Sequence, residues 1–362
     1  MADELLLSKI HDLSDLELAA LLCLVAQEHC IIDTHPEVLD DTVQELELIA
    51  TKVFGLPYAV IDCSENTSLD DFANAILTVE SSESRNNSPV RTRQDYFLNT
   101  GPLFKSIRSP PSDSGALDNK SIASVIIAKN LDEAPRQVQI QALELIRARR
   151  IYTRTAVQIA PKRFLFIGLL AGGEGPRLTK HLNDFIFISH FHDPEDGFPN
   201  TEEIYGDGDE NSISSVVKRS PTRGSDDLSQ PRITAQEIEH LTELADSVTV
   251  SVEVMQYQLN IVSFLRLHRA VGWGISAVAT QHLEKLSKCL APLHGLTYAT
   301  PSLVALAARK IYLHRIHIVK PQNERSMQWG SDVTAVAAIL EGVGPEDVID
   351  DVLVGSGIET PL

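Results

Sequence analysis

Three groups of residues in this chain have the types and spacing that could support chemistry. Asp132-Glu133 follows an apolar stretch, and such a pair could hold a metal-bound water and orient an attacking one. The segment 171–176 (AGGEGP) is glycine-rich and also follows an apolar stretch, so its backbone amides could surround a phosphate. His190 and His192 are two residues apart, which would place two imidazoles on one face of a strand as metal ligands.

Each group also has a structural interpretation, which we favour. Asp132 and Glu133 precede a predicted helix, where acidic residues complement the helix dipole. The segment 171–176 contains an acid and opens no clear helix, which is typical of a flexible loop. His190 and His192 suit the exposed end of a strand. We therefore expect no metal site.

Composition limits the classes of function. The 362 residues are enough for about two domains. The net charge of −19 argues against binding to nucleic acid or to an anionic membrane, since both would repel the chain. Four scattered cysteines indicate reduced thiols. With no signal peptide or membrane-spanning run apparent, we expect a cytoplasmic protein, with a nuclear location as the alternative.

The elements that position these residues begin as a parallel α/β sheet. Apolar runs predict strands, and helical spacing predicts helices between them over 41–54 and 135–149. The strands are expected at 29–33, 58–63, 124–128, 163–170 and 185–189. Strand, helix and strand in this order indicate parallel strands with helices on both faces.

Two polar segments interrupt this pattern, and only helices are expected after the second. Residues 80–122 predict a flexible insertion, and 193–232 a disordered linker. Helical patterns follow over 249–268, 276–290 and 301–315, and 346–353 suits a short docked amphipathic helix. The expected domains are an α/β core over 1–192, the linker over 193–232, a small helical bundle over 233–320, and a C-terminal tail over 321–362 that packs back on this bundle.

Several short strings occur in a fixed order along the chain. They are GPLF at 101–104, APRQVQ at 134–139, PKRFLFI at 161–167, YATP at 298–301, HRI at 314–316 and EGV at 341–343. In their order and spacing these strings resemble AAA+ ATPases of the MoxR and magnesium-chelatase I-subunit (ChlI-like) type. The similarity covers most of residues 29–355 apart from the two polar segments. The resemblance implies an AAA+-like parallel sheet followed by a small all-helical lid.

The resemblance also implies where a nucleotide site would lie, and this chain departs from the family at each position. Asp40 and Asp41 stand where the phosphate-loop Lys and Thr would be, in a segment without glycine. Two carboxylates there would repel a triphosphate. Gapless counting assigns the Walker B pair to Lys129 and Asn130, so Asp132-Glu133 would be a displaced pair. The sensor-1, arginine-finger and sensor-2 positions fall on Ala171, Asp184 and Val278.

We therefore predict a catalytically degenerate member that binds no cofactor and acts as a scaffold or assembly subunit. Its expected partners are other proteins, including AAA+ subunits of a homo- or hetero-oligomer, through which it would serve chaperone-like or metal-insertion work. The alternative is an active ATPase that uses ATP and Mg²⁺ with Asp132 and Glu133 as catalytic residues. In a third possibility the chain contributes only a structural face to a competent neighbour.

Overall fold

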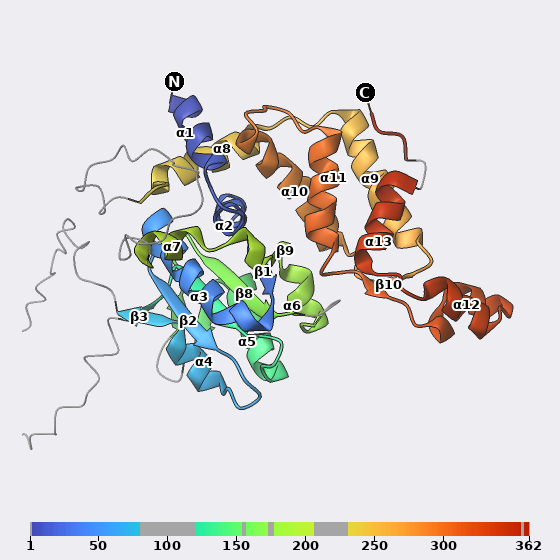
Figure 1. Ribbon diagram of the computed structural model, residues 1–362, viewed down its shortest axis with the longest axis horizontal. Helices are drawn as coiled ribbons and strands as arrows, with labels where there is room; N and C mark the ends of the chain where they lie inside the picture. Colours follow the sequence, from blue (N-terminus) through green and yellow to red (C-terminus); the bar gives the residue numbers. More distant parts are fainter. Residues whose placement is uncertain are drawn as a thin grey trace, which may run out of the picture.

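The centre of the molecule is a five-stranded parallel sheet in the order β2-β5-β8-β1-β9 (Figure 1). The computed structural model describes residues 2–79, 120–153, 157–172, 177–205, 231–355 and 358–361. The strands are β1 (Cys30–Thr34), β2 (Tyr58–Asp62), β5 (Val125–Lys129), β8 (Leu165–Ala171) and β9 (Ile188–His192). The predicted parallel α/β class is confirmed.

Both faces of the sheet are covered, which explains why its strands are continuous apolar runs. On β1, Ile32 packs into a core with α2 (Asp15–Ala26) and α3 (Leu39–Leu48). Ile31 points to the opposite face and into a second core. That core is covered by α4 (Leu69–Ala75), α5 (Arg136–Ala148) and α6 (Lys180–Phe185).

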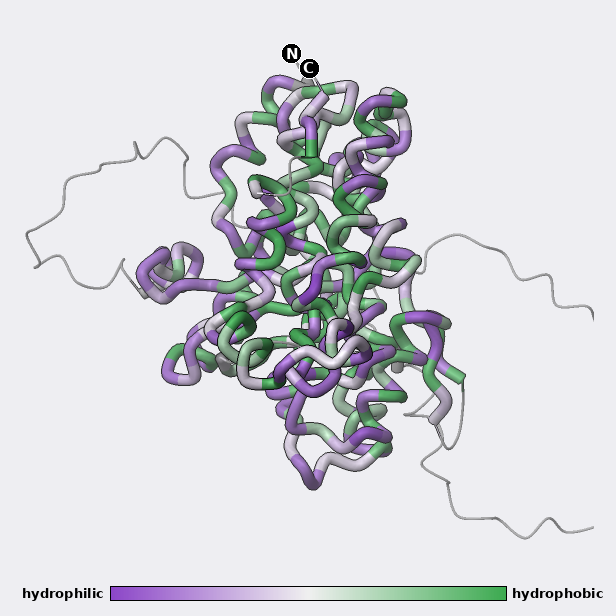
Figure 2. The backbone as a smooth tube through the Cα atoms, turned by 90° about the vertical axis from the view of Figure 1, so that its right-hand side faces the viewer, coloured by the Kyte–Doolittle hydropathy of each residue, from purple (hydrophilic) through white to green (hydrophobic). Residues whose placement is uncertain are grey.

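A helical lid follows and shares the first core with α2, which contacts α8 and α10. Its helices are α8 (Ala235–Ser247), α9 (Val252–Leu267), α10 (Ala277–Leu293), α11 (Pro301–Tyr312), α12 (Val333–Leu340) and α13 (Pro345–Asp350). Thr234 and Glu237 form a capping box at the start of α8. Hydrophobic residues run through the middle of the molecule, where the two parts meet (Figure 2). One face of the α/β sheet and the lid thus share one continuous core.

Two expectations about the strands were wrong. We expected only helices after residue 232, but β10 (Val271–Trp273) pairs antiparallel with β11 (His317–Ile318). Gly274 follows β10 with φ of +122°, and a β-carbon there would lie 2.0 Å from the Arg315 carbonyl oxygen. The last sheet strand spans 188–192 instead of 185–189, because Phe185 completes α6.

The predicted linker does not extend over residues 193–205. Pro194–Asp196 (η5) and α7 (Pro199–Tyr205) are helical there. The buried Glu45 carboxylate accepts from the backbone amides of Asn200 and Thr201, at 3.0 and 2.9 Å. The buried Glu17 carboxylate accepts from Asn200 Nδ2 at 3.0 Å and from Arg232 Nη1 at 3.1 Å. Residues 200 and 232 are therefore held at the same carboxylate.

The remaining elements are short. They are α1 (Ala2–His11), η1 (Pro36–Val38), η2 (Ile49–Val53), β3 (Leu77–Val79), β4 (Lys120–Ile122), β6 (Arg150–Tyr152), β7 (Val157–Ile159), η7 (Pro321–Asn323), η8 (Arg325–Trp329) and η9 (Asp351–Gly355). Residues 120–122, which we placed in the first insertion, pair with β3. The predicted C-terminal docked helix is confirmed: α13 and η9 bury Val348, Ile349 and Val352.

Some predicted features lie outside the described residues. They include GPLF at 101–104 and residues 173–176 of the glycine-rich segment. Three Ser-Pro pairs, at 88, 109 and 220, which the sequence offers as candidate phosphorylation sites, also lie there. Within the described part of the chain, no helix combines the length and apolar character needed to cross a bilayer.

Candidate functional site

The segment that connects β1 to α3 is short, and its residues contact the ends of β8 and β9. Thr34 ends β1, its hydroxyl donates to the His192 carbonyl at 3.2 Å, and its own carbonyl accepts from the Gly172 amide at 2.7 Å. Pro36 begins η1 and supplies no N–H group. A β-carbon on Gly172 would meet the Pro36 ring at 3.6 Å. The turn therefore packs against the end of β8, and Pro36 offers no amide to a phosphate.

Asp40, at the start of α3, forms an ion pair with Lys129 at the end of β5. Lys129 Nζ lies 2.5 Å from Asp40 Oδ1 and 3.7 Å from Asp62 Oδ2. The hydrogen bond to Asp40 raises the pKa of Lys129 above its ordinary value, and the nearby Asp62 adds to this effect. Asp41 is exposed in the same helical turn. Two positions predicted separately are thus in direct contact.

The signs of this pair are the reverse of those that the resemblance assigns to a nucleotide site. The family's lysine falls on Asp40, and its metal-holding aspartate falls on Lys129. In this chain the two side chains carry charges opposite to those that the resemblance implies, and they pair with each other. Such a donor set does not fit ATP with Mg²⁺, because it offers a phosphate one carboxylate and a lysine that is already paired.

Asn130 and Asp132 lie just beyond the end of β5, in two different environments. Asn130 has φ of +53°, and its Nδ2 lies 3.4 Å from Asp62 Oδ1, next to the Lys129 pair. Asp132 Oδ2 lies 3.4 Å from Arg177 Nη1, and Arg177 also pairs with Asp33 on β1. Burial raises the pKa of Asp33 to about 6, against the opposing effect of Arg177. Asp132 thus belongs to a charge cluster that the sequence did not indicate.

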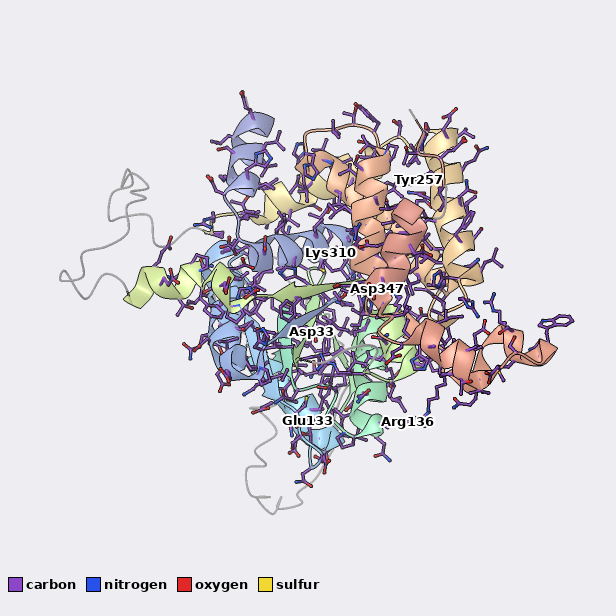
Figure 3. All side chains as sticks on the ribbon, turned by 45° about the vertical axis from the view of Figure 1, so that its right-hand side comes forward. Asp33, Glu133, Arg136, Tyr257, Lys310 and Asp347 are labelled. Atoms are coloured by element: carbon purple, nitrogen blue, oxygen red, sulfur yellow. The ribbon has the colours of Figure 1, made fainter. Side chains whose placement is uncertain are left out.

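Asp132 and Glu133 precede α5, as expected, but neither side chain caps the helix. Helix α5 begins at Arg136 with Pro135 at its N-cap, and no side chain caps it. Glu133 is exposed, and Figure 3 shows it well away from Asp33. The turn is instead closed by the Glu133 amide, which donates to the Asn130 carbonyl at 3.0 Å.

Of the other three predicted positions, Ala171 lies at the same end of the sheet as Lys129, whereas Asp184 and Val278 lie on α6 and α10. Ala171 ends β8 beside Thr34 in register, with a methyl group that can donate no hydrogen bond. Asp184, near the end of α6, accepts a hydrogen bond from the hydroxyl of Ser276. Ser276 is the N-cap of α10, and the half-buried Val278 lies in the first turn of that helix. Asp184 and Val278 thus flank the junction between sheet and lid.

Arg315 holds that junction together. In the sequence this residue was apparent only as part of the HRI string at 314–316. Its buried guanidinium donates to the carbonyls of Asp184, at 3.0 Å, and Ile186, and contacts His282 Nδ1 at 2.7 Å. Asn183 Nδ2 donates to the His314 carbonyl at 2.7 Å. Burial lowers the pKa of Arg315 to about 10, so it stays charged at neutral pH. Several polar groups therefore fix the lid on the sheet.

The histidines that we expected at exposed ends are buried. His190 and His192 are 8% and 2% exposed. Burial lowers the pKa of His190 to about 4, with a further lowering from Lys310, whose Nζ lies 3.1 Å from His190 Nδ1. His314 is also buried, and its Nε2 lies 3.3 Å from the Ile186 carbonyl oxygen. Among the residues that the structure describes, no group of three or more His, Cys, Asp or Glu side chains could hold a metal.

Comparisons with known proteins agree with this architecture. Residues 263–338 match the family model of the AAA lid domain. A crystal structure of a candidate ATPase from Cytophaga hutchinsonii has a TM-score of 0.63 at 13% identity, over 99% of this chain and 94% of that one. A full-length MCM homologue from Methanopyrus kandleri gives 0.44 at 11% identity, over 85% of this chain and 57% of the other. Comparison with curated proteins finds no match. The chain has an AAA+ ATPase fold with an AAA lid.

Proposed function

We propose that this chain is a catalytically degenerate AAA+ protein of the MoxR and magnesium-chelatase I-subunit type. In this proposal it neither binds nor hydrolyses ATP and acts as a scaffold or assembly subunit for other proteins. Its AAA+ fold and lid would serve as a shaped binding surface. Proposed partners are AAA+ subunits of an oligomer or the proteins on which such an oligomer works.

The observation that carries the proposal is the ion pair between Asp40 and Lys129, at a separation of 2.5 Å. A nucleotide site presents cations and bare amides to a polyanion. Here the carboxylate stands in the lysine position, and Pro36 removes an amide from the preceding turn. Restoring phosphate binding would therefore require several simultaneous changes.

The attachment of the lid supports a structural role. Arg315, Asn183 and His314 join α6 and the start of β9 to the lid through protein groups alone. No nucleotide is needed to complete these hydrogen bonds, so the arrangement of sheet and lid would not depend on a bound phosphate. A fixed arrangement suits a scaffold better than a motor, in which bound nucleotide would alter it.

Turnover measurements test the enzymatic side of the proposal. We expect phosphate release from ATP and Mg²⁺ by the purified chain to equal that of a buffer blank. The matched variant is Glu133→Gln, which removes the only exposed carboxylate of the alternative catalytic pair. Turnover in the natural chain that disappears in this variant would contradict the proposal and establish the active-ATPase alternative.

Co-purification tests the scaffold side. Tagged chain isolated from its native cells should retain the same partner proteins in buffers with and without ATP. Recovery of an active AAA+ ATPase would indicate that the chain contributes a structural face to a competent neighbour. Release of every partner on addition of ATP alone would contradict a nucleotide-independent scaffold.

A further inference from the structure

Two adjoining cavities, of about 410 and 390 Å³, lie along β10. They share Val271, Gly272, Trp273 and Arg325 as lining residues, so they form one two-lobed groove, here called the β10 groove. One lobe reaches Lys180 on α6, and the other reaches Lys320 before η7. The groove is therefore elongated and is bounded by the α/β part at one end.

The β10 groove is positively charged in a chain whose net charge is −19. Its cationic side chains are Lys180, Arg266, Arg269, Arg315, Lys320 and Arg325. Among the described residues that line either lobe, Asp184 is the one carboxylate, and it already accepts from Ser276. Glu324 lies 3.6 Å from Arg269 and neutralises that side chain. The positive charge of the groove is thus concentrated locally and only partly compensated.

Neutral groups hold the two central guanidinium groups in place. Arg266 Nε donates to the Ile275 carbonyl at 3.2 Å. Arg325 Nη2 donates to the Arg266 carbonyl at 2.6 Å. Carbonyl oxygens orient a guanidinium without cancelling its charge, so both groups keep their attraction for an anion. The ordering cost of these long side chains is already met in the free protein.

The side chains that surround Trp273 indicate which class of anion the β10 groove can bind. Lys180 Nζ lies 5.0 Å from the centre of its ring, and the His317 ring is 5.0 Å away at an interplanar angle of 31°. Lys180 lines one lobe and His317 lines the other, so neighbours from both lobes cover the indole. A nucleobase would have to displace one of them to stack. The charge of the whole chain also opposes a long polyanion.

We propose that the β10 groove binds an acidic peptide segment of a partner protein. Carboxylates in an extended chain would reach Lys180 in one lobe and Lys320 in the other, with Arg266 and Arg325 between them. Both lysines are exposed and can approach a ligand without rearrangement of the core. This inference goes beyond the proposed function, since it holds whether or not the chain binds ATP.

Binding of a short fluorescent peptide rich in Asp and Glu tests the proposal. A peptide with Asn and Gln at the same positions and a thymidine oligonucleotide serve as comparison ligands. The double variant Lys180→Glu/Lys320→Glu should raise Kd for the acidic peptide by at least about tenfold. Lys52→Glu, a control at an exposed lysine on η2, should change Kd by less than about twofold.

Tryptophan fluorescence locates the binding event. The chain has two tryptophans, and Trp329 is 87% exposed, so Trp329→Phe leaves Trp273 as the sole reporter in a folded protein. An unlabelled acidic peptide should change its emission with the same Kd. Equal affinity of the double variant and the Lys52→Glu control would overturn the proposal. So would equal binding of the neutral peptide, or tighter binding of the oligonucleotide.

Discussion

The Asp40–Lys129 pair and the junction between sheet and lid are both built from charged residues. The pair is exposed to solvent, whereas the charged group of the junction is buried. Asp40 is 80% exposed, and its pair with Lys129 lies at the surface. Arg315 is 1% exposed and is surrounded by carbonyls of the sheet and lid. Surface charges can be exchanged at little cost in stability, whereas a buried guanidinium cannot lose its partners. The comparison indicates that the buried junction, and not the exposed pair, is where charged residues stabilise this fold.

Removal of Arg315 should have the largest effect. Arg315→Met keeps the volume but leaves the Asp184 carbonyl without its donor and the Ile186 carbonyl with His314 alone, and we expect a loss of about 4 kcal/mol in unfolding free energy. Urea denaturation measures it. The control is Arg309→Met, in which an exposed pair with Asp350 is lost, at a cost of about 0–1 kcal/mol. Equal losses of unfolding free energy in the two variants would mean that surface and junction charges stabilise the protein equally, and would contradict this expectation.

Glu45 lies on the buried side of α3. We expect it to contribute to the stability of the protein, whereas the exposed first turn of this helix should contribute little. Glu45→Ala leaves the amides of Asn200 and Thr201 unpaired, so we expect about 3 kcal/mol of destabilisation. Glu37→Ala in the neighbouring exposed η1 should change stability by less than about 0.5 kcal/mol. A similar value for Glu45→Ala in urea denaturation would mean that α7 is not held as described.

The buried His29 should make stability depend on pH. Its Nδ1 accepts from the Phe166 amide at 3.1 Å, and burial lowers its pKa to about 3, with Arg149 adding to the effect. The unfolded state therefore binds the proton first as the pH falls through about 6.5. We expect this group to cost about 2 kcal/mol of stability between about pH 7 and pH 5.

The His29→Gln variant isolates this contribution, because the amide oxygen can still accept from Phe166. Asp33 acts in the opposite direction: its pKa is raised to about 6, so its contribution is present at low pH and is lost as the pH rises through that value. The difference between variant and natural chain cancels the Asp33 term. Parallel stability curves across this pH range would contradict the assignment of His29.

The smallest change in stability is expected at the Asp40–Lys129 pair. Lys129→Met breaks the exposed pair with Asp40 and should change the free energy of unfolding by about 0–1 kcal/mol. The same urea titration measures this change. A loss as large as that of Arg315→Met would show that the Asp40–Lys129 pair has a structural role. Exposed and buried charges would then stabilise this fold equally.

The sequence was sufficient to predict the parallel sheet and the helical lid. It could not predict that Asp40 and Lys129 touch, because motif counting gives positions and no distances. The acceptors of Arg315 lie about 130 residues away, at Asp184 and Ile186, so its role was not visible in the HRI string.

Burial explains two other errors in the sequence predictions. His192 lies at the end of β9, and its ring is 5.0 Å from the Phe198 ring. Lys310 on α11 covers His190, on the same face of that strand. An edge strand looks exposed in sequence until the elements that cover it are known. The junction strands β10 and β11 were missed because each is too short for an alternating pattern.

Equilibrium binding of fluorescent ATP with Mg²⁺ to the natural chain tests the central claim most directly. With Asp40 and Lys129 paired and no phosphate loop between β1 and α3, we predict no saturable binding at micromolar protein. Saturable binding that is lost in an Asp40 or Lys129 variant would place the nucleotide at this position and contradict the account.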